Sequence, residues 1–248
     1  MNTQPRNTTT DAIFDGSLSC RQHVSGYRFS VDSVLLADFV EIKKNDTVLE
    51  LGTGCGVVGL ILCYRHQSVP FTVTGIECQR DLAELARINI AENGYEDTFS
   101  IIEGDLTDHR RMFQPESFSL VISNPPFFAR GTGRINDDAE SGKARHQNET
   151  KLEDFVSTAS FCVKNRGRVF FVFPAVFSIQ LIELLTRHRL TPKTVQYLYS
   201  YPESEQATLM LVEAVKNGGA GCTVRAPFYL YQYKNGPYSD RAKRLYDP

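Results

Sequence analysis

Hydrophobic residues occur along the chain in two patterns that alternate from about residue 31 onward. Short, mostly apolar runs, such as Thr47–Leu51, are typical of strands buried on both faces of a sheet. Longer segments, such as residues 80–93, place apolar side chains every three or four positions, which is typical of helices. The alternation predicts an α/β fold with a mainly parallel sheet and helices on both of its faces.

The two patterns assign an element to most of the chain. Strands are predicted at residues 47–51, 71–76, 99–102, 118–123, 168–173, 195–199 and 207–214. Helices are predicted at residues 31–40, 57–65, 80–93, 151–164 and 176–189, and residues 223–233 are expected to add an edge segment. Residues 1–11 are rich in Thr and Asn and are expected to form a disordered tail, so that residues 12–248 make up a single domain.

Charge is distributed unevenly, although its total is close to zero. The 248 residues include 27 Lys and Arg and 29 Asp and Glu, a formal net charge of -2 that argues against a uniformly basic nucleic-acid binder. Residues 75–120 hold ten acidic and four basic side chains, residues 164–193 hold six basic and one acidic, and residues 222–248 hold five basic and two acidic. A local basic face is therefore compatible with the total.

Nothing in the sequence predicts a membrane span, a secretory signal or a metal centre. The longest apolar run, Val169–Phe177, is too short to cross a bilayer and contains Pro174, and the N-terminal residues have no apolar core. The six cysteines form no CxxC pair and no zinc-like cluster with His. We expect the thiols to be reduced, which is typical of a cytoplasmic protein. We also expect the protein to bind no metal and to be a monomer.

A glycine cluster, Gly52-Thr-Gly54-Cys-Gly56-Val-Val-Gly59, joins the first predicted strand to the helix after it. The glycines allow a sharp turn and a close approach of backbone to ligand, and the helix start behind them offers N–H groups. A strand, a glycine-rich turn and a helix in this order are typical of a nucleotide-cofactor site. Both NAD and S-adenosylmethionine (SAM) fit such a site.

Acidic residues at successive strand ends refine this choice. Glu77 lies 21 residues beyond Gly56, where a carboxylate can bind the ribose hydroxyls of either cofactor. Asp105 follows the third strand and can accept a hydrogen bond from a cofactor adenine amine, or else cap a turn. Glu50 stands just before Gly52, and the run Leu-Glu-Leu-Gly-Thr-Gly-Cys-Gly resembles the first motif of class I SAM-dependent methyltransferases. This resemblance favours SAM over NAD. We expect the cofactor to contact the three acids Glu50, Glu77 and Asp105 and the glycines Gly52, Gly54 and Gly56.

The fourth strand is followed by Asn124-Pro125-Pro126-Phe127. The prolines stiffen the turn, so that the Pro125 carbonyl is a fixed acceptor beside the side-chain oxygen of Asn124, and Phe127 offers a flat face for stacking. Two acceptors that hold the N–H groups of an aromatic amine favour the tetrahedral nitrogen that attacks a methyl group. No general base is then strictly required. The motif resembles the signature of class I methyltransferases that act on the amino nitrogen of adenine, guanine or glutamine.

Residues 22–37 are similar to a stretch of the bacterial tRNA1(Val) adenine-N6 methyltransferases, as are residues 131–134, 144–146 and 238–239. The resemblance covers nearly the whole chain from about residue 12. It implies a Rossmann-like class I methyltransferase fold whose mainly parallel, seven-stranded sheet has one antiparallel edge strand. It also implies methyl transfer from SAM to the N6 of an adenine next to the anticodon of a tRNA.

The same resemblance implies that Tyr27, Phe29 and Ser30 lie beside the methionine end of SAM. From the residues alone, these side chains are equally compatible with core packing and with the N-cap of the helix that begins at Val31. Gln147 departs from the family, which usually has a glutamate after the histidine at position 146. The importance of that position is therefore open.

Two groups of basic residues are candidates for RNA contact. The first follows the catalytic turn and comprises Arg130, Arg134, Lys143, Arg145 and His146, although the acids Asp137, Asp138, Glu140 and Glu149 among them are typical of a solvated loop. The second comprises Lys234, Arg241, Lys243 and Arg244, with Tyr229, Tyr231, Tyr233 and Tyr238 nearby. These tyrosines are also compatible with packing or with an edge strand, and we slightly favour that interpretation.

Other functions remain compatible with parts of this pattern. The same chemistry serves adenine-N6 or guanine-N2 methylation of rRNA and glutamine-N5 methylation of a protein. The glutamine branch usually has Tyr at the last motif position and a helical N-terminal domain, whereas about 46 residues precede the first predicted strand here. An NAD oxidoreductase would need an acid/base partner, and none is evident. A non-catalytic SAM- or RNA-binding module would bind without turnover.

Overall fold

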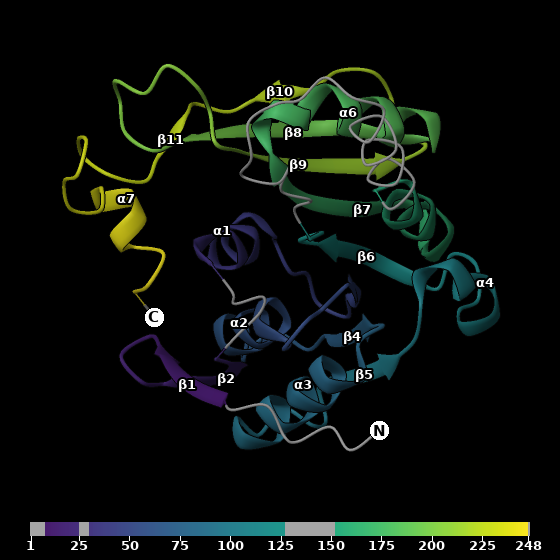
Figure 1. Ribbon diagram of the computed structural model, residues 1–248. Coiled ribbons are helices and arrows are strands. Elements are labelled where there is room, and N and C mark those ends of the chain that lie inside the picture. Colours follow the sequence, from purple (N-terminus) through teal and green to yellow (C-terminus); the bar gives the residue numbers. More distant parts are fainter. Residues whose placement is uncertain (1–7, 25–29, 127–151, 248) are drawn as a thin grey trace, which may run out of the picture.

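The computed structural model describes residues 8–24, 30–126 and 152–247. Its elements are β1 (Thr8–Ile13), β2 (Leu18–His23), α1 (Val31–Phe39), β3 (Thr47–Leu51), α2 (Val57–Arg65), β4 (Thr72–Glu77), α3 (Arg80–Glu92), β5 (Phe99–Glu103), η1 (Leu106–Asp108), α4 (His109–Met112), β6 (Phe118–Ser123), a helix over residues 152–162, β7 (Val163–Pro174), η2 (Ala175–Phe177), α6 (Ser178–Arg187), β8 (Leu190–Tyr199), β9 (Leu209–Lys216), β10 (Thr223–Val224), β11 (Phe228–Tyr229) and α7 (Asp240–Lys243) (Figure 1).

The central sheet has nine strands in the order β10-β8-β9-β7-β6-β3-β4-β5, with β11 also paired to β8. Strands β5, β4, β3, β6 and β7 are parallel to one another, whereas β9 is antiparallel to both β7 and β8. The predicted α/β class, with a mainly parallel sheet and helices on both faces, is confirmed. The seven predicted strands are all present, and two strands of two residues each extend the sheet beyond β8.

The prediction of an antiparallel strand at the edge is wrong. Strand β9 lies between β7 and β8 and pairs antiparallel with both, and its run Leu209–Val212 is buried, as is usual for a strand inside a sheet. Strand β8 has more partly exposed side chains and a register irregularity next to Pro192, features that suit a position nearer the edge.

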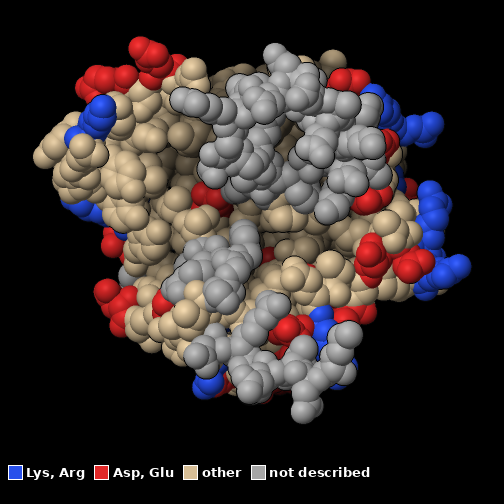
Figure 2. All heavy atoms as spheres, in the orientation of Figure 1, with Lys and Arg blue, Asp and Glu red and all other residues tan. Residues whose placement is uncertain are grey.

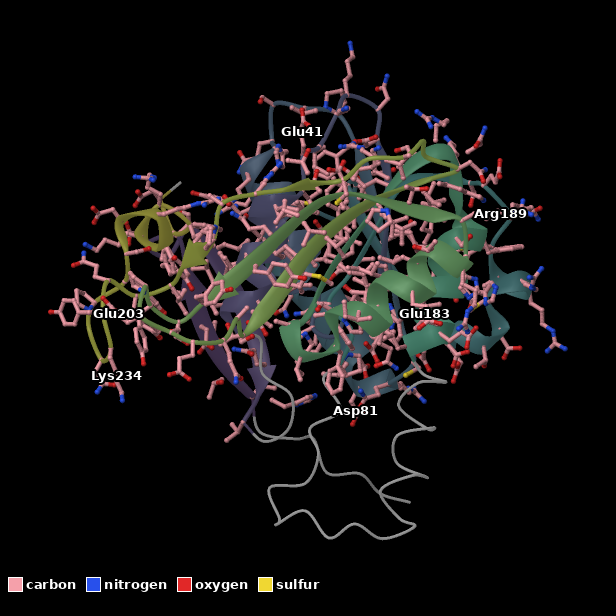
Figure 3. The ribbon with its side chains drawn as sticks, turned by 90° about the horizontal axis from the view of Figure 1, so that it is seen from above. Glu41, Asp81, Glu183, Arg189, Glu203 and Lys234 are labelled. Carbon is pink, nitrogen blue, oxygen red and sulfur yellow. The ribbon has the colours of Figure 1, made fainter. Side chains whose placement is uncertain are left out.

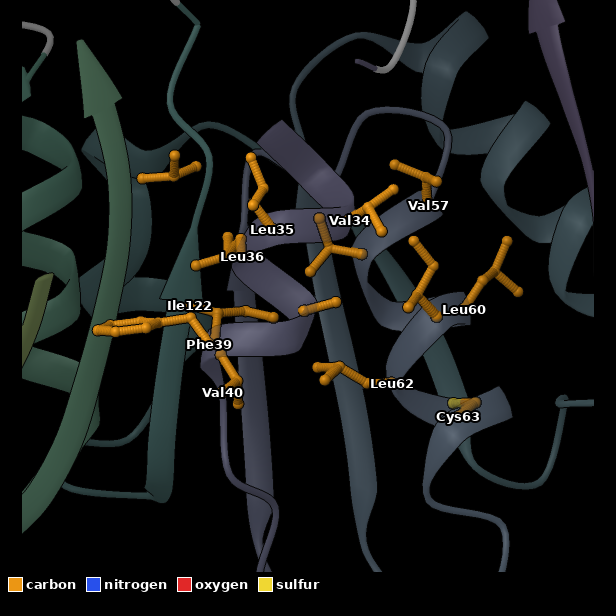
Figure 4. Close-up of a cluster of buried hydrophobic side chains, with 14 of the residues drawn as sticks. Val34, Leu35, Leu36, Phe39, Val40, Val57, Leu60, Leu62, Cys63 and Ile122 are labelled. Carbon is orange, nitrogen blue, oxygen red and sulfur yellow. The ribbon is translucent and has the colours of Figure 1, made fainter. Parts of the chain in front are cut away.

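Two hydrophobic cores cover the two faces of the sheet. Helices α1, α2 and α3 pack on one face, toward which Val48 and Ile122 point, and Figure 4 shows side chains of α1 and α2 gathered around Ile122. Helix 152–162 and α6 cover the other face, which receives Leu49 and Val121. Neighbouring residues of one strand enter different cores because successive side chains alternate across a sheet, so these strands are apolar throughout.

An N-terminal hairpin, β1–β2, packs beside α3 outside the central sheet. Side-chain amides of α3 hold it: Asn89 accepts from the Arg21 N–H at 2.8 Å and donates to the Arg21 carbonyl at 3.0 Å, and Asn93 accepts from the Ser19 N–H at 3.0 Å. The prediction of a disordered tail over residues 1–11 is wrong for Thr8–Asp11, which pair with β2. Within the described ranges, no helix is long and apolar enough to cross a membrane.

Candidate active site

A cavity of about 500 Å³ opens where β3, β4, β5 and β6 end. Parallel strands bring their carboxyl ends to one edge of the sheet, which is where ligands bind in open α/β folds. Its walls are formed by Gly52, Gly54, Ile76, Glu77, Cys78, Gln79, Leu82, Gly104, Asp105, Leu106, Thr107, Asn124, Pro126, Asp154 and Phe155. Residues that are far apart in the sequence but that the motifs single out thus meet in one place.

The glycine-rich turn forms the floor of the cavity at the end of β3. Gly52 and Gly54 have φ angles of 67° and 59°, in the left-handed region that favours glycine. A Cβ atom at Gly54 would meet nothing within 4 Å, so the backbone there is open to a ligand. Gly56 was also predicted to bind the cofactor, but it is outside the cavity lining and precedes α2, where a Cβ would meet Ala86 and Phe99.

Glu77 ends β4 and ties two neighbouring segments together. Its Oε2 accepts the N–H of Gly54 at 2.9 Å, and its Oε1 accepts the N–H of Gln79 at 2.9 Å. The side chain is 5% exposed and lines the cavity. Each carboxylate oxygen has a further lone pair, so Glu77 can also accept from a ligand hydroxyl.

Glu50 was predicted to contact the cofactor, but the structure buries it below the glycine-rich turn. It is 3% exposed, does not line the cavity, and its Oε2 accepts the N–H of Gly59 at 3.1 Å. Burial raises the pKa of this carboxyl to about 8. Gly59 is required for packing, since a Cβ there would lie 2.4 Å from Phe99 and 2.9 Å from the Glu50 carboxylate. Glu50 therefore supports the turn from beneath.

Asp105 caps the segment that follows β5 and also borders the cavity. Its Oδ1 accepts the N–H of Thr107 at 2.9 Å and the Thr107 hydroxyl at 2.8 Å, which caps η1. The Thr107 N–H lowers the pKa of Asp105, so this carboxylate stays ionised. The residue also lines the cavity. Capping and ligand contact are compatible because the carboxylate has further acceptor sites.

The Asn124-Pro125-Pro126 turn follows β6 directly. Asn124 and Pro126 line the cavity, while Pro125 is buried behind them. The Asn124 Nδ2 donates to the Ser33 hydroxyl of α1 at 3.3 Å, which fixes the orientation of the amide. Phe127 lies outside the described residues, as do Tyr27 and Phe29.

Ser30 is described, and it caps α1 by accepting the N–H of Asp32 at 3.4 Å. This is the N-cap role considered for it, and Ser30 is not among the cavity residues. The first group of candidate RNA-binding residues, which comprises Arg130, Arg134, Lys143, Arg145 and His146, lies outside the described residues together with Gln147.

The second candidate RNA patch contains tyrosines that pack on one another. The rings of Tyr231 and Tyr238 stack with centroids 5.3 Å apart, and Tyr238 stacks on Tyr246 at 6.1 Å. Arg241 lies over the ring of Phe228 at 4.6 Å. Lys234 projects from this C-terminal segment into solvent (Figure 3).

The face of the molecule in Figure 2 carries acidic and basic side chains interspersed.

Sequence motifs missed the cavity wall contributed by helix 152–162. Asp154 and Phe155 line the cavity, and the Phe155 ring lies 3.0 Å from the position of a Cβ on Gly52. The helix itself was predicted from its apolar spacing. The face that it turns toward the cavity depends on how it packs on the sheet, which no local pattern reveals.

A mainly parallel sheet of this order, with carboxylates and an asparagine gathered at its carboxyl edge, defines a class I methyltransferase fold. Solved structures agree. A predicted O-methyltransferase from Agrobacterium tumefaciens has a TM-score of 0.70 at 22% identity, covering 86% of this chain and 94% of that one. A T. thermophilus 16S rRNA N2 G1207 methyltransferase, solved with AdoMet and guanosine, has a TM-score of 0.58 at 18% identity, covering 85% and 50%.

The chain belongs to the methyltransferase small domain family, whose model matches residues 25–199. Curated relatives named tRNA1(Val) (adenine(37)-N6)-methyltransferase include those of Aeromonas salmonicida, 27% identical over 62% of this chain and 63% of that protein, and Proteus mirabilis, 29% identical over 64% and 62%. Another, from Porphyromonas gingivalis, is 29% identical over 74% and 72%. The match thus spans less than two thirds of the first two relatives.

Proposed function

We propose that this chain is a SAM-dependent N-methyltransferase whose target is the N6 of an adenine in tRNA, next to the anticodon. One observation carries the proposal: the Asn124-Pro125-Pro126 turn shares a single cavity with Glu77 and Asp105. A cofactor site and an amine-binding turn are thereby within reach of one another. The names of the curated relatives support the choice of tRNA and of adenine N6.

The cavity suits the parts of SAM. Glu77 supplies acceptors for the two ribose hydroxyls, and Asp105 supplies an acceptor for the adenine amine. Ile76, Leu82 and Leu106 provide apolar surface for a planar base. The open space above Gly54 leaves room for the remainder of the cofactor. Bound SAM would supply an electrophilic methyl group on a sulfonium.

The substrate side follows from the turn after β6. The side-chain oxygen of Asn124 and the carbonyl of Pro125 would accept the two N–H groups of the target amine, with Phe127 stacking on its base. Accepting both hydrogens draws the nitrogen lone pair out of the aromatic ring. The nitrogen would then be able to attack the methyl carbon, with the sulfur as the leaving group, and the amine proton would pass to water. Holding the reacting groups in line would lower the barrier to transfer.

A base in an anticodon loop suits such a site, because it is single-stranded and turns outward at small cost. The net charge of -2 is compatible with an enzyme that holds one loop of RNA briefly and releases it.

The test is to incubate the purified chain with methyl-labelled SAM and separate pools of tRNA, rRNA and release factor. We expect label in tRNA as N6-methyladenine, and a loss of at least about a hundredfold in rate with Asn124→Ala. Asn165→Ala is the control, because Asn165 is exposed at the start of β7. Label confined to rRNA or to protein would refute tRNA as the substrate. Unchanged activity of Asn124→Ala would refute the role of this residue in the mechanism. Binding of NADH without binding of SAM would refute SAM as the cofactor.

A further inference from the structure

Helix 152–162 turns one face toward the segment that begins with Asp105. The Thr158 hydroxyl donates to the carbonyl of Leu106 at 3.3 Å. One turn later, the Phe161 ring packs against the His109 ring with centroids 5.1 Å apart. Both contacts bind the helix to the cavity wall that follows β5.

Asp154 lies on the same face of this helix. It precedes Thr158 by four positions and Phe161 by seven, and residues at these intervals share one side of a helix. Asp154 and Asp105 both line the cavity, and their carboxyl groups are close enough for the charge of Asp105 to raise the pKa of Asp154.

The two carboxyl groups differ in their protein partners. Asp105 accepts two hydrogen bonds from Thr107. No residue within the described ranges donates a hydrogen bond to the half-buried Asp154 carboxyl. Burial raises the pKa of Asp154, the negative charges of Asp105 and Glu153 raise it further, and His109 lowers it. A half-buried carboxylate without a donor is stabilised when a ligand brings one.

We propose that Asp154 is a second acceptor for the exocyclic amine of the cofactor adenine, opposite Asp105, and that it determines specificity for adenine. The inference rests on the proposed function, since it requires SAM in this cavity. An exocyclic amine has two N–H groups, and carboxylates on β5 and on helix 152–162 provide one acceptor for each. A purine with an oxygen at this position would place its lone pairs against two carboxylates. The resulting repulsion would weaken its binding.

The probes that test this role are S-adenosylhomocysteine and its deaminated analogue S-inosylhomocysteine. The first carries an exocyclic amine on its purine ring, and the second carries an oxygen at the same position. Calorimetric titration of the full chain gives a dissociation constant for each. We expect the wild type to prefer the adenine form by at least about a hundredfold. Asp154→Asn should weaken the adenine form about tenfold and bind the oxo form more tightly, because the asparagine amide donates to its oxygen.

Glu153→Gln is the matched control, since it removes the same charge from the adjacent residue, which contacts His188 and does not line the cavity. Its ratio of the two dissociation constants should equal that of the wild type. A ratio unchanged in Asp154→Asn, or reduced equally in Glu153→Gln, would overturn the role of Asp154 and leave SAM binding standing. A wild type that binds neither ligand would overturn the proposed function, and this role with it. Thermal unfolding verifies that both variants are folded.

Discussion

At the scale of single residues, the proposed role of Glu77 in binding SAM can be tested directly. Glu77→Gln keeps the size of the side chain but removes the charge that receives the Gly54 and Gln79 N–H groups. We expect the dissociation constant for SAM to rise about ten- to a hundredfold, because charge-assisted hydrogen bonds to ligand hydroxyls are lost. Calorimetric titration measures the change. Glu103→Gln is the control, since Glu103 ends the neighbouring strand but is exposed, and an equal loss there would contradict the role of Glu77.

Glu50 makes the free energy of unfolding depend on pH. Burial raises the pKa of its carboxyl from 4.5 to about 8. Between these values the unfolded chain ionises while the folded protein keeps the proton, so the free energy of unfolding falls as pH rises through this window, by at most about 5 kcal/mol.

Urea unfolding at pH 5 and pH 8 measures this loss. Glu50→Gln carries no ionisable group and still accepts the Gly59 N–H, so the variant should lose less free energy of unfolding between the two pH values than the wild type. An identical pH dependence in both proteins would show that Glu50 ionises freely in the folded state.

At the scale of elements, α3 connects the central sheet to the N-terminal hairpin. It follows β4, the strand that carries Glu77, and its side chains bind the β1–β2 hairpin. Asn89 is fully buried and bonds Arg21 of β2 and the Cys55 carbonyl of the glycine-rich turn. Asn89→Ala should reduce the free energy of unfolding by about 2–3 kcal/mol, since it leaves buried backbone groups without partners. Hydrogen exchange in β1–β2 should become faster. Glu84→Ala on the exposed face of α3 should change neither.

The elements that the sequence predicted correctly are those whose apolar residues recur with a clear helix or strand spacing. The strand ends that carry Glu77, Asp105 and Asn124 were predictable because each follows a short segment rich in apolar and β-branched residues. The hairpin was not, since the side chains of Thr8–Asp11 are mostly exposed and polar and give no alternation. The cavity position of Asp154 was not either, because it depends on the packing of one helix against another segment. The place of β9 inside the sheet likewise depends on tertiary pairing.

At the scale of the whole molecule, the two edges of the sheet have different tasks. The carboxyl edge forms the cavity, while the amino edge holds a buried ion pair between Arg168 at 13% exposure and Asp46 at 10%, with Nη2 and Oδ2 2.7 Å apart. Ser119 also donates to Asp46, at 2.7 Å, and Arg168 donates to the Glu41 carbonyl. These contacts join β7, β6 and the segments around α1 and β3.

Stability and ligand binding should therefore separate in Arg168→Met. The variant keeps an apolar stem but leaves the Asp46 carboxylate buried without its cation, so the free energy of unfolding should fall by about 3 kcal/mol. The dissociation constant for SAM should stay within about twofold of the wild type, because the cavity lies at the opposite edge. Urea unfolding and calorimetric titration measure the two quantities on the same preparations. A large loss of SAM affinity in folded Arg168→Met would show that the two edges of the sheet are coupled, and the separation of tasks would not hold.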